Sequence, residues 1–406
     1  MSKSNETTPN VPTLRFAEFA EQWEQKTFDE TFLILSNNTL SRAELNYKNG
    51  NYKNIHYGDV LIKFSAFIDV SSPDVPYIND ENSSSKLDNI LLQDGDIIIA
   101  DTAEDFTVGK ATEVENIDEI KVVSGLHTIP CRPKIKFSPR YLGYYVNSPA
   151  YHNQLIPFIQ GVKVSSISKT LIKKTFVSFP SLPEQTKIAD FLSCLDKKIE
   201  TQNKIISDLK VLKKELCNKV FSNGSTVRLG DFIEEVTTRN KSNSCENVLS
   251  VSNKMGFIKQ SEQFEDRTVA SENKSNYKVV TEGCFAYNPA RINVGSIALL
   301  STYKIGIISP MYVCFKTKSA LDSEYLNFYY QSGFFYKELQ KKLEGSVRQC
   351  LTYENMSEIL IPYVGIEEQK AIAATLNKFA TLIANEEKYL KSLQKQKSYF
   401  LSAMFI

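Results

Sequence analysis

The chain has 406 residues, of which 42% are hydrophobic and 11% aromatic, enough for two or three domains with their own cores. Lys and Arg (48) balance Asp and Glu (47), so the formal net charge is +1. This balance excludes a strongly basic nucleic-acid-binding protein, and any DNA contact would have to use a local patch.

The N-terminal residues are polar and include Pro9 and Pro12. We therefore expect residues 1–13 to form a flexible tail. No apolar run has the length of a membrane span, and the start shows no signal-peptide pattern. The expected location is the cytoplasm.

Both halves of the chain mix strand and helix patterns. These patterns predict strands at 96–100, 171–179, 305–308, 311–315 and 359–363, and helices at 140–153 and 323–343. Turns marked by Pro180, Pro183 and Pro362 then precede two long helices, which are predicted at 184–222 and 367–406. The predicted fold class is α+β.

The seven cysteines are scattered and form no C-x-x-C pair, and the three histidines are widely separated. These patterns predict neither a disulfide framework nor a metal site. We interpret the cysteines as small buried hydrophobic residues.

An internal repeat relates the two halves. Residues 141–145 (YLGYY) match residues 325–329 (YLNFY) at an offset of 184, and Glu184-Gln185 falls on Glu368-Gln369 at the same offset. Weaker matches join Lys26-Thr27-Phe28 to Val227-Arg228-Leu229, Asp94-Gly95 to Glu282-Gly283, Val108-Gly109 to Val294-Gly295, and Gly161 to Gly345.

The repeat is strongest in the two long helices, where seam positions recur in alternating steps of four and three. The first seam is Ile188, Leu192, Leu195, Ile199, Gln202, Ile206, Leu209, Lys213, Leu216 and Val220; the second is Ile372, Leu376, Phe379, Ile383, Glu386, Leu390, Leu393, Lys397, Phe400 and Met404. A sustained 3.5-residue period predicts a coiled coil. The alternative is two amphipathic helices that each pack on their own domain.

We expect the two helices, each about 35 residues and roughly 50 Å long, to pair antiparallel within one chain with pseudo-two-fold symmetry. This pairing would bring Gln202 near Glu386 at mid-helix. A buried polar pair of this kind can fix the register of a coiled coil.

Four groups of residues, in order along nearly the whole chain, resemble the specificity subunits of type I restriction–modification systems. They are residues 12–16 with Phe19 and Trp23-Glu24; the junction 179–185 with Ile188-Ala189; the stretch 287–295 (YNPARINVG); and the second junction of Ile361-Pro362, Glu367-Glu368-Gln369 and Ile372-Ala373. The first half departs from the pattern, because it has DTAED at 101–105 where the second half has NPAR at 288–291.

The resemblance implies two target-recognition domains, 14–183 and 223–366, that each read one half of a split double-stranded DNA site. The spacer helices, 184–222 and 367–406, would set the unread gap. The resemblance also implies two modification subunits that supply S-adenosylmethionine and adenine methylation, and restriction subunits that use ATP and Mg. The chain itself would be a non-catalytic subunit with no cofactor.

Sequence is read on base edges by Arg, Lys, Asn, Gln, Ser and Thr, while phosphates are bound mainly by Lys and Arg. Loops rich in these residues are therefore the candidate DNA contacts. In the second half the candidates are Arg239, Asn240, Lys241, Asn288, Arg291, Asn293, Arg348 and Gln349; in the first half they are Lys63, Ser65, Thr102, Lys110, Gln160, Lys163, Ser165 and Ser166. We expect residues 102–110 to be the counterpart of the Arg291 loop, and residues 160–166 to be that of 345–349.

The sequence contains only weak matches to the motifs of methyltransferases, ATP-hydrolysing enzymes and nucleases. Asn288-Pro289-Ala290-Arg291 has arginine where an amino-methyltransferase motif needs an aromatic residue to stack the flipped base. No phosphate-binding G-x-x-x-x-G-K-[ST] loop occurs, and the nuclease-like Glu119-Ile120-Lys121 has no partner motif nearby.

Two other functions compete with a specificity subunit. One is a stand-alone bipartite DNA-binding or decoy protein with a dimerising coiled coil. The other is a single-chain methyltransferase–nuclease, which the missing cofactor and phosphate loops disfavour.

Overall fold

The computed structural model describes residues 10–79, 85–161, 163–222, 224–253, 255–263, 274–344 and 349–406. The chain forms two compact units: unit 1 is Met1–Gln202 with Tyr389–Ile406, and unit 2 is Asn203–Lys388. Within the described ranges, no helix has the length and apolar character needed to cross a membrane.

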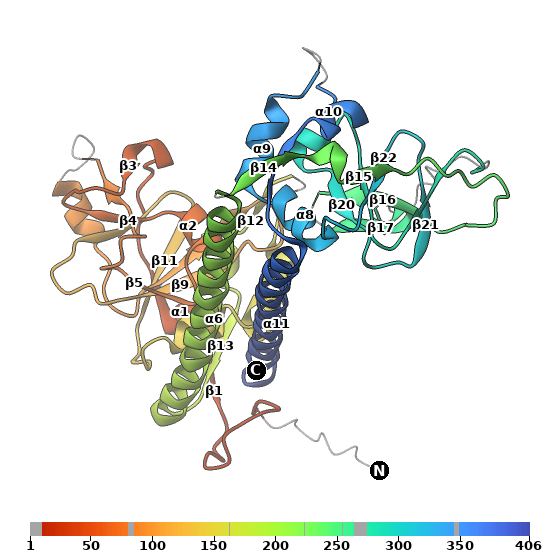
Figure 1. The fold of residues 1–406 in the computed structure, drawn as a ribbon. Coiled ribbons are helices and arrows are strands. Elements are labelled where there is room, and N and C mark those ends of the chain that lie inside the picture. The colour runs from red at the N-terminus through yellow and green to blue at the C-terminus, as the bar shows by residue number, and fades with distance from the viewer. Residues whose placement is uncertain are drawn as a thin grey trace, which may run out of the picture. The chain divides into compact units, whose positions relative to one another are not determined.

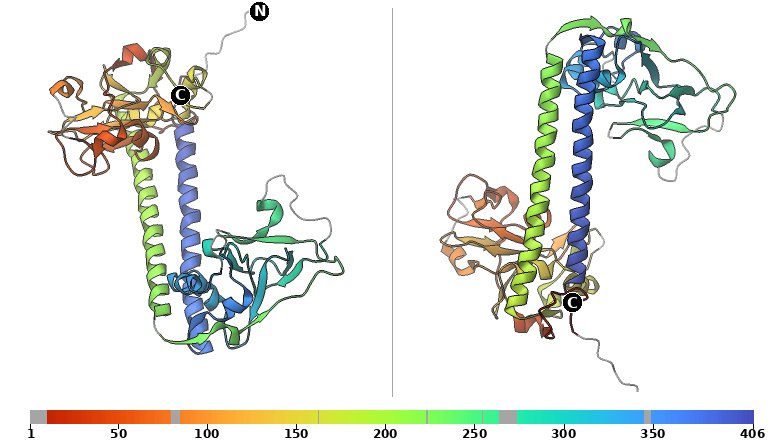
Figure 2. Two further views of the ribbon diagram at one scale, coloured as in Figure 1. Left: turned by 90° about the horizontal axis from the view of Figure 1, so that it is seen from above. Right: turned by 60° about the horizontal axis from the view of Figure 1, so that its bottom comes forward.

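Two long helices, α6 (Leu182–Ser222) and α11 (Ile366–Ala403), each contribute one segment to unit 1 and one to unit 2. In the three views of Figures 1 and 2 they run side by side. Each unit therefore contains one globular domain and a segment of both helices, and the predicted boundaries between domains and spacer helices stay a prediction.

Unit 1 contains a five-stranded sheet of order β2-β11-β7-β9-β5 and a four-stranded sheet of order β10-β4-β6-β3, with the short pairs β1-β13 and β12-β8. Its strands are β1 (Glu24–Thr27), β2 (Phe32–Ile34), β3 (Leu45–Asn46), β4 (Lys53–Ile55), β5 (Phe67–Asp69), β6 (Tyr77–Ile78), β7 (Ile97–Ala100), β8 (Thr102–Ala103), β9 (Ala111–Glu115), β10 (Val122–Ser124), β11 (Thr128–Pro133), β12 (Ser165–Ser166) and β13 (Phe176–Phe179). Its helices are α1 (Phe28–Thr31), α2 (Tyr57–Ile62), α3 (Tyr141–Val146), α4 (Pro149–Leu155) and α5 (Lys169–Ile172), with 3-10 turns η1 (Arg42–Glu44), η3 (Ser85–Ile90) and η4 (Ile156–Phe158).

Unit 2 contains two four-stranded sheets, β15-β22-β19-β20 and β17-β16-β21-β18, and the pair β14-β23. Its strands are β14 (Ser225–Arg228), β15 (Ile233–Glu235), β16 (Val248–Ser252), β17 (Gly256–Lys259), β18 (Lys278–Thr281), β19 (Cys284–Tyr287), β20 (Ile297–Leu299), β21 (Ile305–Ile308), β22 (Val313–Thr317) and β23 (Leu360–Tyr363). Its helices are α7 (Gln260–Gln263), α8 (Ser323–Tyr330), α9 (Gly333–Gln340) and α10 (Tyr353–Ser357), with 3-10 turns η5 (Leu229–Asp231) and η6 (Ile292–Val294).

The repeat seen in the sequence is a repeat of structure. The order β2-β11-β7-β9 of unit 1 matches the order β15-β22-β19-β20 of unit 2. The first strands also match in register, since Thr27 pairs with Phe176 and Arg228 pairs with Leu360, and the two partners Phe176 and Leu360 stand at the repeat offset of 184. Even the weak match of 26–28 to 227–229 is therefore confirmed.

A buried glutamine anchors the start of each long helix. Gln185 accepts a hydrogen bond from the Ser138 N–H at 2.9 Å and donates to the Pro180 carbonyl at 2.8 Å. Gln369 does the same with the Asp322 N–H and the Val364 carbonyl, both at 2.8 Å. The two junctions between domain and long helix are thus built alike. In each of them, one glutamine side chain pairs a backbone N–H and a backbone carbonyl that would otherwise be buried without a hydrogen bond.

The helices predicted at 140–153 and 323–343 are each interrupted. Ser148 and Ser332 stop the first helix of each pair and cap the second, since their hydroxyls accept from the Tyr151 and Phe335 N–H groups. A serine at the N-cap satisfies a helix donor that the continuing helix would have paired internally. The strand predicted at 171–179 is also partly wrong, because its first residues form α5.

The seam of α6 and α11 is confirmed by burial. Seam residues are buried or half-buried in both helices, whereas most intervening residues are exposed. In unit 1 the rings of Phe191 and Phe400 meet at 4.8 Å, so the start of α6 packs on the end of α11. In unit 2 Cys217 and Leu376 share one core, so the end of α6 packs on the start of α11. These contacts make the pair antiparallel.

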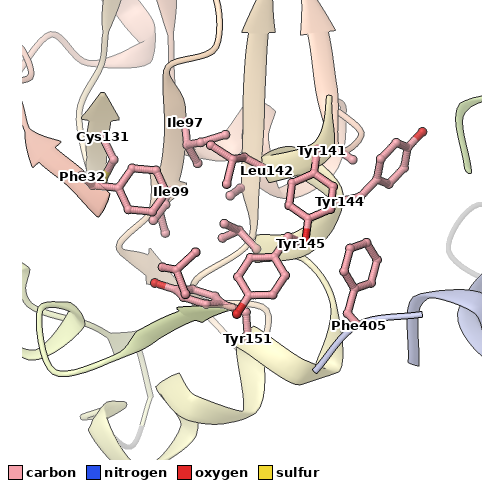
Figure 3. Close-up of a cluster of buried hydrophobic side chains, with 14 of the residues drawn as sticks. Phe32, Ile97, Ile99, Cys131, Tyr141, Leu142, Tyr144, Tyr145, Tyr151 and Phe405 are labelled. Atoms are coloured by element: carbon pink, nitrogen blue, oxygen red, sulfur yellow. The ribbon is translucent and has the colours of Figure 1, made fainter. Parts of the chain in front are cut away.

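The last residues of each helix also enter a domain core. Phe405, just after α11, lies 5.9 Å and 5.8 Å from the rings of Tyr141 and Tyr145 in unit 1, as Figure 3 shows. Phe221, at the end of α6, lies 5.2 Å from Tyr325 in unit 2. The two phenylalanines are 184 residues apart, so the pseudo-symmetry includes the helix ends.

Two expectations need correction. The described end of the predicted flexible tail is bound to the fold, because the N–H of Trp23 donates to the Asn10 carbonyl and the hydroxyl of Thr13 donates to the Ala403 carbonyl. The cysteines are not all buried: Cys194 is exposed on α6, and Cys245 and Cys350 are half-buried.

Candidate nucleic-acid interface

The loop after the central strand of the main sheet is equivalent in the two units. In unit 1 strand β7 is followed by residues 101–110 and then β9, and in unit 2 strand β19 is followed by residues 288–296 and then β20. Each loop ends in a glycine with a left-handed backbone, Gly109 (φ 91°) and Gly295 (φ 87°). This placement agrees with the expected equivalence of residues 102–110 and the Arg291 loop.

A second polar segment lies against each of these loops. Gln160 and Ser166 exchange backbone hydrogen bonds across a short turn, and Glu344 and Cys350 do the same 184 residues later. In unit 1 the segment pairs with the first loop through Ser166 opposite Thr102. In unit 2 the Leu351 N–H donates to the Pro289 carbonyl. The structure thus brings together candidates that are about 60 residues apart in sequence.

The Arg291 side chain is exposed, while its backbone holds the loop together. The Arg291 N–H donates to the Asn288 carbonyl at 3.0 Å, and its own carbonyl accepts from the N–H groups of Val294 and Ser296 at 3.2 Å each. Asn288 and Asn293 are half-buried beside it. A loop that is held by its own backbone hydrogen bonds and presents an exposed cation suits base recognition, because the side chain is free to reach into the groove.

The other candidates divide by exposure. Those with exposed side chains are Lys63, Ser65, Gln160, Lys163, Ser166, Arg239, Lys241 and Gln349; Thr102, Lys110 and Ser165 are half-buried. Arg348 lies outside the described residues.

Two candidates serve the fold. Asn240 is buried, and its amide donates to the Cys245 carbonyl at 2.9 Å and accepts the Cys245 N–H at 3.2 Å. The Lys110 ammonium donates to the Leu61 carbonyl at 2.8 Å, and burial lowers the pKa of this lysine. Both groups are already paired inside the protein, so a direct DNA contact by Asn240 is not supported, and one by Lys110 would break its bond to Leu61.

Lys63 lies in a group of polar residues on unit 1 whose other members were not among the predicted candidates. Its ammonium lies 3.1 Å from the Tyr47 hydroxyl and 4.4 Å from the centre of that ring, and the hydrogen bond raises the pKa of Lys63. Arg42 pairs with Asp59 at 2.8 Å beside it. Arg42 also lies 3.4 Å from His56, whose pKa is lowered by burial and by that arginine.

Asp101 and His127 are further polar residues absent from the predicted set. Asp101 is the first residue of the unit 1 loop, directly after β7, and His127 lies in the turn before β11 with a left-handed backbone (φ 54°). They meet because β7 and β11 are neighbours, with Ala100 opposite Thr128. The signal in the sequence was the alignment of Asp101 with Asn288, but nothing local pointed to His127.

Comparison with known proteins gives a consistent match. A family model for the type I restriction modification DNA specificity domain matches twice, at residues 20–211 and 222–395. The MjaX specificity subunit of Methanocaldococcus jannaschii is 25% identical over 97% of this chain and 95% of that protein. The MjaVIII specificity subunit of the same organism is 25% identical over 60% of this chain and 64% of that protein.

Solved structures agree in fold. The S subunit of a type I restriction–modification system from M. genitalium superposes with a TM-score of 0.58 at 14% identity, over 98% of this chain and 99% of that chain. A chain from a study of type I restriction–modification complex assembly and conformational transition gives a TM-score of 0.56 at 16% identity, over 93% of this chain and 96% of that chain.

Proposed function

Because this chain belongs to the type I restriction modification DNA specificity family, we propose that it reads a bipartite DNA target with one domain for each half-site. The family is the non-catalytic recognition part of these systems, so methylation and cleavage belong to other subunits. The observation that carries the proposal is the duplicated loop, 101–110 and 288–296, which follows equivalent strands of equivalent sheets and contacts a second segment through Ser166 opposite Thr102 in unit 1 and through the Leu351 N–H and the Pro289 carbonyl in unit 2.

The proposed partners are two modification subunits, which would bind S-adenosylmethionine, and restriction subunits, which would use ATP and Mg. Two copies of the modification subunit suit a scaffold whose two junctions are built alike, through Gln185 and Gln369. Equivalent surfaces related by pseudo-symmetry favour two equal partners.

The test is to express the full chain with the modification subunit of its own system and to sequence the methylated bases of the host genome. We expect one motif made of two specified parts separated by unspecified bases. A single continuous motif, or no methylation with a modification subunit known to be folded, would contradict the proposal. Sequence-specific binding by the chain without any partner would instead support the stand-alone DNA-binding alternative.

A further inference from the structure

The unit 1 loop lacks the arginine of its unit 2 counterpart but carries a polar cluster of its own. The His127 Nδ1 atom lies 3.3 Å from the Asp101 Oδ1 atom. The Thr102 hydroxyl donates to the same carboxylate oxygen at 2.7 Å. Two polar groups from two loops therefore converge on one oxygen.

The imidazole ring of His127 is held in place yet reachable. Its side chain is 47% exposed, and its ring packs edge-on against Tyr57 with centroids 5.2 Å apart. The Asp101 N–H also donates to the His127 carbonyl at 3.1 Å. In the described part of the chain, the hydrogen-bond contacts of the ring all involve Nδ1.

The chemistry of the cluster follows from the carboxylate. A carboxylate only accepts hydrogen bonds, so the tautomer of the imidazole that satisfies Asp101 has its proton on Nδ1 and its lone pair on Nε2. The proton of the Thr102 hydroxyl is directed to Asp101 as well. The cluster therefore offers acceptors to an incoming ligand.

In the DNA major groove the strong donors on base edges are the exocyclic amino groups, N4 of cytosine and N6 of adenine. Guanine offers the acceptors O6 and N7, which suit the donors of an arginine such as Arg291. At equivalent loops, unit 1 thus presents hydrogen-bond acceptors and unit 2 presents the donors of Arg291.

We propose that His127 reads the amino group of an adenine or a cytosine in the first half-site, and that Asp101 is the positioning residue that sets its tautomer. This inference rests on the proposed function. It names a specificity residue for unit 1, His127, which alignment with the Asn-Pro-Ala-Arg stretch of unit 2 could not supply.

The first test replaces His127 with glycine in the full chain, expressed with its modification subunit. Glycine adopts the left-handed backbone (φ 54°) without strain, so the fold is kept while the ring is removed. We expect discrimination at one base position of the first half-site to fall about tenfold or more, with the second half-site unchanged. An unaltered motif would overturn the inference while leaving the proposed function intact.

Asn116→Gly is the matched control. Asn116 also has a left-handed backbone (φ 59°), but it follows the far end of β9 and its amide donates to Asp69. This variant should methylate the same motif as the parent protein. If it relaxed the same base position, the effect of His127→Gly would have to be assigned to the backbone and the inference would fail.

Asp101→Asn tests the tautomer. An asparagine amide can donate to Nδ1, which moves the ring proton to Nε2 and turns that atom into a donor. We expect the preferred base at the same position to change from adenine or cytosine to guanine or thymine, which present the acceptors O6 and O4 in place of an amino group. A uniform loss of binding on every base would show a merely structural role for Asp101.

Discussion

Arg291 is an exposed cation on a loop whose hydrogen bonds are made by its backbone. Replacing it with alanine should therefore leave the fold intact and remove one contact. If the guanidinium binds a guanine through two hydrogen bonds, we expect specific binding to fall by about 1–3 kcal/mol and one position of the second half-site to be relaxed. The measurement is a titration of cognate and singly substituted duplexes at fixed salt.

Arg228→Ala is a fair comparison for this variant, because Arg228 is an exposed arginine of the same unit that pairs with Glu358. It should change neither affinity nor motif. A loss that Arg291→Ala shows equally on all duplexes would make Arg291 a phosphate contact instead.

Glu113 is a buried residue of β9 whose carboxyl group accepts hydrogen bonds from backbone N–H groups at the start of α3. Its two oxygens accept from the Arg140 and Gly143 N–H groups at 2.6 Å and 2.9 Å, and burial raises its pKa from 4.5 to about 7. Between these values the folded chain binds more protons at this site than the unfolded chain. The Glu113 contribution to the free energy of unfolding should therefore decrease as the pH rises from 4.5 to about 7.

Urea unfolding at several pH values, with Glu113→Gln beside the parent protein, checks this expectation. The variant has no titrating group at the site, so the difference between the two stabilities should vary across this window. Parallel pH curves would mean that Glu113 stays ionised in the folded state.

At the scale of elements, the lysine in each seam contacts an aromatic ring of the neighbouring domain. Lys213 of α6 lies 5.1 Å from the centre of the Phe328 ring in unit 2, and Lys397 of α11 lies 5.9 Å from that of Tyr144 in unit 1. Each lysine thus connects a helix to the domain packed against it. Lys397 also pairs with a carboxylate, that of Asp196, at 2.5 Å.

Removing these lysines should have unequal effects. Lys397→Ala leaves the largely buried Asp196 without its cation, so we expect a loss of about 1–3 kcal/mol of stability. Lys213→Ala should cost about 0.5–1 kcal/mol, because it removes the cation–π contact with Phe328. Chemical denaturation of the full chain measures both.

Lys210→Ala provides a baseline for this comparison, since Lys210 forms an exposed pair with Glu387. Such pairs contribute little, so the change should stay within about 0.5 kcal/mol. Equal losses for Lys397 and Lys210 would contradict the role given to Asp196.

The periodicity of the long helices was predicted correctly, but the short helices were not. The apolar pattern continues across Ser148 and Ser332, so a period-based prediction joins α3 to α4 and α8 to α9. The signals for the breaks, Ser148-Pro149 and Ser332-Gly333, are local and were available in the sequence. Whether such a signal ends a helix also depends on how the following helix packs in the domain, which the local sequence does not specify.

At the scale of the whole molecule, α6 and α11 are proposed to set the distance between the two recognition domains. Inserting seven residues into each helix, after Gln202 and after Glu386, should keep the seam in phase and lengthen the pair by about 10 Å. We expect a methylated motif with the same half-sites and a gap longer by up to about three base pairs. An insertion in both helices that leaves the gap unchanged would refute the role of the helices as a ruler.

The sequence by itself determined the repeat, the order of the parts and the antiparallel seam. These features are encoded locally, since a 3.5-residue period and a copied junction motif need no knowledge of distant contacts. The proposed hydrogen-bonded pairing of Gln202 with Glu386 stays a prediction.

Only the tertiary structure decided which loop residues contact each other and which have side chains that are already hydrogen-bonded inside the protein. Asp101 lies beside His127 because β7 pairs with β11. The Asn240 side chain is hydrogen-bonded to Cys245 within its own loop, and the Leu14 N–H donates to the Ala403 carbonyl at the end of α11. Each of these depends on strand register or on contacts between residues far apart in sequence. A local pattern cannot specify such contacts, because their register is set by the packing of whole elements.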